Sequence, residues 1–286
     1  MSIHKRTKLN WLERNLPDGY LADAAWFERN GISRQLRSKY VANGWLVSPA
    51  RGVYSRPQQT QADFAVPWMR LVISLNELLD IRVWIGGRTA LELSGFGHYL
   101  SEENMREIHL YSYDTLPGWM HHLNLDARVI QHNARRLFER SVDVQSNGKS
   151  TEVLGAYTNS LTRLEATLPF LNTTGNRSIV VSSPERAILE LLNEVPDRET
   201  FHQADALFEG LRNLSPTRLQ PLLQDCRSVK VKRLLFWYAE RHDHSWLNRL
   251  DRSKIDLGSG KRMLVRGGKL NTKYNITVPG NMDAVI

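Results

Sequence analysis

Cysteine is nearly absent from this chain of 286 residues, which contains only Cys226. A single cysteine excludes an internal disulfide and fits a reducing compartment. Because Cys226 follows a leucine-rich helix pattern, we expect it to be an inert thiol packed in the core.

Long apolar runs are also absent. No stretch approaches the roughly 20 apolar residues that a membrane-spanning helix needs. The N-terminal segment MSIHKRTKLNWLERNL lacks the apolar centre of a signal peptide. These absences predict a cytoplasmic protein with no membrane partner.

Motifs typical of enzymes are lacking as well. The sequence contains no nucleophile elbow, no phosphate loop with its lysine and no kinase signature. Its histidines, among them His121-His122, His132, His242 and His244, do not have the spacing of a zinc site. We therefore expect no enzymatic activity, no cofactor and no metal.

A glycine pair leaves one nucleotide-binding alternative open. Residues 83–85 have an apolar strand pattern, and Gly86-Gly87 separates it from a helix pattern over residues 88–94. A helix N-terminus that follows a glycine turn presents amide groups able to bind phosphate. Glycine at such a turn more often allows close packing of strand and helix, and we expect packing here.

Charge is unevenly distributed along the chain, whose net charge is +8. Residues 1–60 hold 10 Lys/Arg against 4 Asp/Glu, giving +6, and residues 227–286 hold 13 against 5, giving +8. Residues 61–226 hold 15 against 21, giving −6. Basic segments attract phosphate backbones whatever the base sequence. The two basic ends therefore indicate a nucleic-acid partner, with two solvated surfaces as the alternative.

Residues 17–56 have the pattern of a winged helix-turn-helix. A first helix pattern ends at Gly31, because glycine tolerates the left-handed turn. Ser33 can cap a second helix over residues 34–43, which ends at Asn43-Gly44. Residues 45–47 and 53–55 predict two strands joined by a turn over residues 48–52. Two helices with a short turn and a hairpin are the layout of this DNA-binding fold.

The second of these helices predicts a DNA-reading face. Leu36 and Tyr40 share one side and are expected to point inward, while Arg34, Gln35 and Arg37 are expected to be exposed. Arginine reads guanine edges and glutamine reads adenine edges, and either can bind phosphate. Basic residues of the hairpin would meet the backbone or the minor groove. The residues expected to bind DNA are Ser33, Arg34, Gln35, Arg37, Ser38, Lys39, Arg51 and Arg56.

We expect an α+β protein with two domains. Residues 1–60 form the winged helix-turn-helix domain, completed by a first helix over residues 4–16, and the aperiodic polar segment 56–61 marks the boundary. Residues 61–286 form a larger mixed α/β domain with a basic C-terminal end. Its expected strands are residues 83–85, 108–111, 126–131 and 151–157, and its expected helices are residues 66–79, 88–94, 184–192, 201–212, 216–225 and 229–240.

The basic C-terminal end predicts a second contact with phosphate. Three basic residues begin the helix pattern 229–240, where positive charge opposes the helix macrodipole and so suggests an anionic partner. Two strand patterns, residues 261–265 and 273–278, predict a basic hairpin. The residues expected to contact phosphate are Lys230, Lys232, Arg233, Lys261, Arg262, Arg266 and Lys269.

Four motifs follow one another along the chain. The first is GISRQLRSKYVANGWLVSPARGVYSRP, and the others are IGGRTALELSGF (85–96), HLYSYDTLPGWM (109–120) and SPERAILELL (183–192). Together they resemble the AbiEi-type antitoxins of type IV toxin–antitoxin systems, which act in abortive infection. The matching positions of the first motif are Ile32-Ser33, Tyr40-Val41, Gly44-Trp45-Leu46 and Gly52-Val53-Tyr54.

This resemblance implies a bacterial DNA-binding antitoxin that represses its own operon through inverted repeats. Its partner would be a nucleotidyltransferase-like toxin, which such antitoxins counter without a stable complex. The C-terminal domain, and with it the basic end, would contribute to antitoxicity. Three alternatives stay open: a winged-helix regulator unrelated to a toxin, a winged helix that packs on a protein partner, and a nucleotide-binding enzyme that uses Gly86-Gly87.

Overall fold

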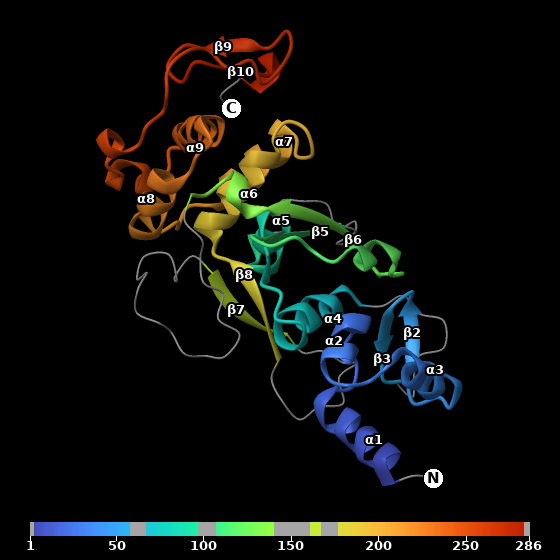
Figure 1. The fold of residues 1–286 in the computed structure, drawn as a ribbon. Coiled ribbons are helices and arrows are strands. Elements are labelled where there is room, and N and C mark those ends of the chain that lie inside the picture. The colour runs from blue at the N-terminus through green and yellow to red at the C-terminus, as the bar shows by residue number, and fades with distance from the viewer. Residues whose placement is uncertain (1–2, 58–66, 97–106, 140–160, 167–176, 283–286) are drawn as a thin grey trace.

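The N-terminal part of the chain has the element order of a winged helix (Figure 1). The structure, a computed structural model, describes residues 3–57, 67–96, 107–139, 161–166 and 177–282. Helix α1 (Ile3–Asn15) precedes the short strand β1 (Ala22–Asp23) and the helices α2 (Ala24–Arg29) and α3 (Arg34–Ala42). Strands β2 (Val47–Ala50) and β3 (Val53–Ser55) form the wing, and the small antiparallel sheet has the order β1-β3-β2.

Local capping chemistry sets the limits of α3. The Ser33 hydroxyl accepts a hydrogen bond from the Leu36 amide at 3.4 Å, as its position predicts. Gly31 and Gly44 have φ angles of 71° and 72°, which close the turn before α3 and end the helix after it. Tyr40 is buried and Leu36 packs against the core, so the inward face of α3 is confirmed.

The wing differs in detail from its prediction. Strand β2 continues through Pro49 to Ala50, so the turn contains only Arg51 and Gly52. Proline cannot donate a hydrogen bond to a sheet, but β2 is an edge strand and needs no donor on its outer side.

A mixed sheet of five strands forms the centre of the remaining chain. Its order is β6-β5-β4-β8-β7, from β4 (Val83–Ile85), β5 (Glu107–Ser112), β6 (Arg128–Asn133), β7 (Leu161–Ala166) and β8 (Arg177–Ser182). Strand β4 pairs with β5 antiparallel and with β8 parallel, while β5 and β6 are parallel and β7 and β8 antiparallel. The first three expected strands are confirmed, whereas the expected strand 151–157 lies outside the described residues.

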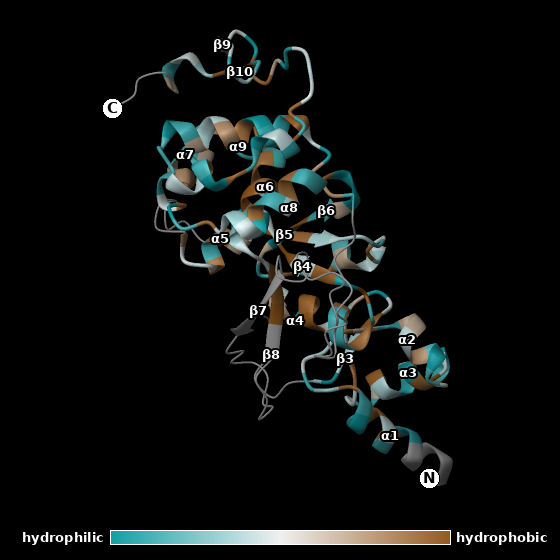
Figure 2. Cartoon of the chain, turned by 90° about the vertical axis from the view of Figure 1, so that its left-hand side faces the viewer, coloured by the Kyte–Doolittle hydropathy of each residue, from teal (hydrophilic) through white to brown (hydrophobic). Residues whose placement is uncertain are grey.

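Helices pack against this sheet and against one another. They are α5 (Gly87–Leu93), α6 (Pro184–Glu194), α7 (Phe201–Gly210), α8 (Pro216–Asp225) and α9 (Val229–Arg241). Helix α6 packs between α5 and α9, and Figure 2 shows its largely hydrophobic surface. Cys226 is buried just after α8, and burial raises its thiol pKa to about 11, as expected of a packing cysteine. No helix in the described part of the chain is long and apolar enough to cross a membrane.

The C-terminal hairpin is smaller than its prediction. Its strands are β9 (Lys269–Asn271) and β10 (Ile276–Val278), and residues 261–265 form no strand of their own. Arg262 alone makes an isolated parallel bridge to Ile276. The consecutive glycines Gly267-Gly268 interrupt the apolar alternation that suggested a longer strand.

Helix α4 (Trp68–Ile73) joins the winged helix to the sheet and continues as one π-helical turn, Ser74–Leu78. The Ser74 hydroxyl accepts a hydrogen bond from the Leu21 amide at 2.8 Å, and Tyr20 donates to Glu77. Arg70 Nε donates to the Gly19 carbonyl at 2.5 Å. Hydrogen bonds therefore cross the predicted domain boundary near residue 60, and one apolar core extends over both sides.

Candidate nucleic-acid interface

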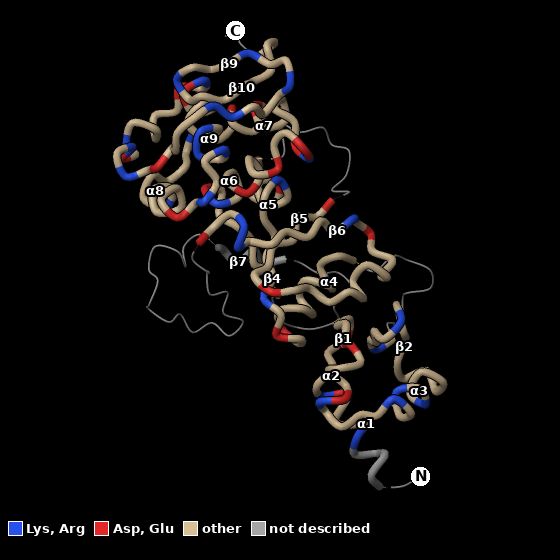
Figure 3. Tube along the Cα trace, turned by 45° about the horizontal axis from the view of Figure 1, so that its top comes forward, with Lys and Arg blue, Asp and Glu red and all other residues tan. Residues whose placement is uncertain are grey.

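Helix α3 presents a polar face to solvent. Arg34, Gln35, Ser38 and Lys39 are exposed and, with Ala42, line a shallow hollow along the helix. Figure 3 shows basic residues along α3 at one end of the molecule. These side chains belong to the types that bind base edges and phosphates. The hydroxyl of Ser33 instead caps the helix, so its contribution is to position the first turn.

Arg37 does not lie on this face, and the prediction that it is exposed is wrong. Only 3% of Arg37 is exposed. Its guanidinium donates to the carbonyl of Ile32 at 2.9 Å, pairs with Glu28 at 2.9 Å and lies 5.7 Å from the centre of the Tyr54 ring. A buried guanidinium needs such partners, and the helix turn supplies them. Arg37 therefore holds α2, α3 and the wing together.

The two arginines of the wing differ in the same way. Arg51 is exposed at the tip and makes no hydrogen bond or ion pair within the described part of the chain. Arg56 pairs with Asp18 at 3.0 Å and donates to the carbonyls of Glu13 and Leu16 at 3.3 and 3.4 Å. Arg56 thus fastens the base of the wing to α1, and only Arg51 is available for a backbone contact.

The basic start of α9 also has internal partners. Lys230 Nζ donates to the carbonyls of Asn193 and Val195 at 2.7 and 2.6 Å, and burial lowers its pKa. The guanidinium of Arg233 donates to four carbonyls, and burial together with nearby Arg262 lowers its pKa. Lys232 is buried. The expectation that these three residues contact phosphate is therefore wrong, because none reaches solvent freely.

The other basic residues of the C-terminal end are exposed on the hairpin. They are Lys261, Arg262, Arg266 and Lys269. Figures 1 and 3 show this hairpin at the end of the molecule opposite to α3. The structure therefore separates two basic surfaces that the sequence had suggested only as charge totals.

The Gly86-Gly87 turn is filled by the protein's own carboxylate. Glu190 accepts hydrogen bonds from the Gly87 amide at 3.0 Å, the Ser182 hydroxyl at 2.7 Å and the Arg186 guanidinium at 2.8 Å. A side chain at Gly86 would overlap Glu190 and the Tyr111 ring. The packing interpretation is confirmed, and the phosphate interpretation is wrong because the N-terminus of α5 already binds an anion.

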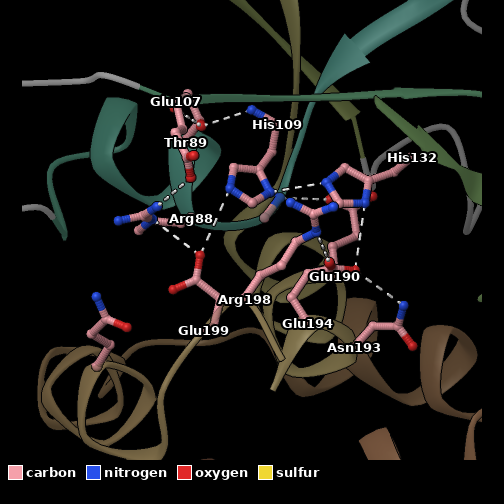
Figure 4. Close-up of polar contacts among 12 residues, drawn as sticks. Arg88, Thr89, Glu107, His109, His132, Glu190, Asn193, Glu194, Arg198 and Glu199 are labelled. Carbon is pink, nitrogen blue, oxygen red and sulfur yellow. Dashed lines mark hydrogen bonds and ion pairs between the residues drawn. The ribbon is translucent and has the colours of Figure 1, made fainter. Parts of the chain in front are cut away.

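Sequence reasoning missed a polar cluster between the sheet and the helices (Figure 4). His109 Nδ1 lies 3.0 Å from His132 Nε2, His132 Nδ1 lies 3.4 Å from Glu194, and His109 Nε2 lies 3.7 Å from Glu199. Arg88 Nε lies 3.1 Å from the Glu199 carboxylate. The chain of contacts ties β5 and β6 to α5, α6 and the loop before α7. Its members are separated in sequence, and their spacing gave no signal.

Burial dominates the electrostatics of this cluster. Glu199 is only 1% exposed, and burial raises its pKa to about 7. Burial, with nearby His132 and Arg88, lowers the pKa of His109 to about 3. Both oxygens of Glu199 and Nε2 of His109 lack a well-aligned hydrogen bond. No group of three or more His, Cys, Asp and Glu side chains among the described residues could hold a metal ion.

Two family models cover nearly the whole chain. One is described as "Transcriptional regulator, AbiEi antitoxin N-terminal domain" and matches residues 5–102. The other is described as "Transcriptional regulator, AbiEi antitoxin, Type IV TA system" and matches residues 105–279. The chain belongs to the AbiEi antitoxin family. The resemblance found in its motifs is thereby confirmed, and the protein is a transcriptional regulator of the type IV toxin–antitoxin class.

The fold of this antitoxin has a solved counterpart. The RV2827C protein from Mycobacterium tuberculosis aligns with a TM-score of 0.54 and 13% sequence identity, over 96% of this chain and 91% of that chain. At this identity the likeness concerns the fold alone. None of the curated proteins compared with the antitoxin matches it.

Proposed function

We propose that this antitoxin binds double-stranded operator DNA with α3 in the major groove and the tip of the wing on the phosphate backbone. The observation that supports the proposal is the division of labour among the arginines. Arg34 and Arg51 extend into solvent without internal partners, whereas Arg37 and Arg56 are occupied inside the fold. A surface kept polar on a rigid support is the arrangement that groove recognition needs.

In this proposal the operator contains inverted repeats, and binding represses the operon that encodes the antitoxin. The partner is a nucleotidyltransferase-like toxin, which the antitoxin counters in the cytoplasm without a stable complex. The antitoxin itself performs no catalysis. Glu190 at the Gly86-Gly87 turn supports this last point, because it occupies the position that a nucleotide phosphate would need.

An electrophoretic mobility assay with the full chain tests operator binding. DNA from upstream of its own operon and unrelated DNA of equal length are compared at near-physiological salt. We expect the upstream DNA to bind at least about a thousand times more tightly, which is the low end for specific recognition. Equal binding of the two DNAs would refute the operator assignment. It would favour a winged helix that packs on a protein partner.

A further inference from the structure

The C-terminal hairpin carries positive charge without acidic neighbours in its own sequence. Residues 257–282 contain five Lys/Arg and no Asp or Glu. Lys273 pairs with Glu240 at 2.7 Å. Lys261, Arg262 and Arg266 are exposed and form no ion pair in the part of the chain that the structure describes. We call Lys261, Arg262, Arg266 and Lys269 the hairpin patch.

Exposed cations elsewhere commonly have a carboxylate partner. Arg128 pairs with Glu107 at 3.1 Å, and Lys254 pairs with Asp251 at 2.9 Å. The hairpin patch therefore differs from an ordinary solvated surface, where opposite charges are interspersed.

The backbone that carries the patch is held firmly. The Arg262 amide donates to the Asn275 carbonyl at 2.8 Å, and the Arg262 carbonyl accepts from the Thr277 amide at 3.1 Å. The Thr277 hydroxyl accepts from the amides of Leu264 and Val265 at 2.8 and 3.0 Å. Arg233 supports the loop below through the carbonyls of residues 257, 258 and 260. A fixed backbone reduces the entropy lost when the patch binds a partner.

An exposed apolar side chain accompanies this charge. Met263 is 73% exposed. The other large apolar side chains that are exposed among the described residues are Val41 and Val47, at the end of α3 and the start of β2. Exposed apolar groups gathered at one place commonly mark a contact surface. In this protein they occur only beside the two basic surfaces within the described ranges.

We propose that the hairpin patch binds the phosphodiester backbone of a second nucleic acid, independently of base sequence. Its cations are spread along one exposed segment and do not converge on a buried pocket, which suits a polyanion with regularly spaced charge. The segment 261–269 offers no Asn, Gln or aromatic side chain for base recognition. The patch faces away from α3 across the length of the molecule (Figure 1), so it cannot extend the operator surface. The proposal goes beyond operator binding and does not depend on it.

The test uses full-length protein in which Arg34→Ala and Lys39→Ala first weaken the α3 surface. On this background, Lys261→Ser with Arg266→Ser removes two unpaired cations of the patch. The matched control, Arg128→Ser with Lys254→Ser, removes two exposed cations that already have carboxylate partners. Fluorescence anisotropy then measures binding of a duplex DNA unrelated to the operator, a single-stranded RNA and an RNA hairpin over a salt series.

The patch variant is expected to bind about tenfold more weakly at about 0.1 M salt. The slope of log affinity against log salt should fall by about 1.8 for a duplex and about 1.4 for a single strand, since two phosphate contacts are lost. The control should lose less than half of that slope. The nucleic acid with the larger loss identifies the natural partner as DNA or RNA.

Equal slopes for the patch and control variants with all three nucleic acids would overturn the proposal. Thermal unfolding of both variants excludes a folding defect, because the four changed side chains are exposed. Operator binding measured with an intact α3 reports on the proposed function separately. Failure of one proposal therefore leaves the other untouched.

Discussion

The Gly87 amide lies 3.0 Å from the Glu190 carboxylate, so the N-terminus of α5 binds a side chain of α6. The same carboxylate accepts from Trp84 Nε1 at 3.2 Å and from Arg186 at 2.8 Å. Glu190 therefore joins β4, α5 and α6 at a single buried point. The glycine pair serves the fold by letting this carboxylate approach the backbone.

Replacing Glu190 by glutamine should destabilise the protein strongly. The amide group of glutamine would face donors, and the buried Arg186 would lose its ion pair. Breaking a buried pair costs about 3–5 kcal/mol, and chemical denaturation would measure the loss. Glu209→Gln, at an exposed position, is the control and should change the free energy of unfolding by less than about 0.5 kcal/mol. A stable E190Q protein would contradict this account of the glycine turn.

The same contact predicts that nucleotides do not bind at Gly86-Gly87. Isothermal titration of the full chain with nucleoside triphosphates and magnesium should give no heat above dilution. Micromolar binding that disappears in Gly87→Val would show that Glu190 yields its place to phosphate. The enzymatic alternative would then be restored.

Arg34 and Arg37 should give opposite results although they are three residues apart in α3. Arg34→Ala should weaken operator binding by about 1–3 kcal/mol without changing stability, because it removes an exposed contact. Arg37→Ala should lower the unfolding free energy by about 2 kcal/mol or more, because Glu28 and the Ile32 carbonyl lose their buried partner. Arg29→Ala, at an exposed position of α2, controls for the loss of one charge. The comparison fails if Arg34→Ala and Arg29→Ala bind the operator equally well.

The wing arginines allow a second comparison. Arg51→Ala should weaken binding to all DNA sequences alike and lower the salt slope by about 1, as expected for one phosphate contact. Arg56→Ala should act mainly on stability, through its contacts with Asp18 and the end of α1. Anisotropy titrations at several salt concentrations, with thermal unfolding alongside, would separate the two effects. A sequence-dependent loss in Arg51→Ala would instead indicate a base contact.

The buried cluster should make stability depend on pH. The pKa of Glu199 is about 7 in the folded protein and about 4.3 in an unfolded chain. Between these values the folded state holds a proton that the unfolded state has released, so this contribution is lost as pH rises. His109 acts in the opposite direction between its folded pKa of about 3 and its ordinary value of about 6.5.

Glu199→Gln removes the first effect and leaves the second. The stability of the variant relative to the parent should therefore increase by on the order of 2 kcal/mol between about pH 4.5 and 7.5. Urea titrations across this range measure the difference, with Glu209→Gln again as the control. A difference that does not change with pH would show that Glu199 titrates normally.

Antitoxicity should separate from repression at the hairpin patch. A variant with Lys261, Arg262, Arg266 and Lys269 changed to serine should still repress a reporter fused to its promoter, because α3 is at the opposite end. It should lose protection when the toxin is co-expressed, since the C-terminal end is proposed to act on a phosphate-rich target. Full protection by this variant would assign antitoxicity to another surface.

Local signals predicted the secondary structure well. Ser33, Gly31 and Gly44 delimited α3 because capping and left-handed turns depend on single residues. The glycine pair was recognised as packing, although its partner Glu190 is 103 residues away and could not be named. Strand β8 was missed, although its apolar run Ile179-Val180-Val181 was visible in the sequence.

The basic residues were the weakest part of the prediction, for a physical reason. Helical periodicity places Arg37 near Tyr40, but charge argued for exposure, and only tertiary contacts show which consideration prevails. The carbonyls at the end of a neighbouring helix satisfied Arg37, and loop carbonyls satisfied Arg233. Backbone acceptors carry no signal in a sequence. Charge totals therefore overstated the number of cations that can meet nucleic acid.

The burial of Arg37 makes α3 a helix whose reading positions can be exchanged. Arg34, Gln35, Ser38 and Lys39 touch solvent, so their identities can change while the fold is kept. Arg37 and Tyr40 belong to the core and must stay. Diverging antitoxins could thus acquire new operators by drift at four positions, and an engineer could redirect the repressor by randomising the same four.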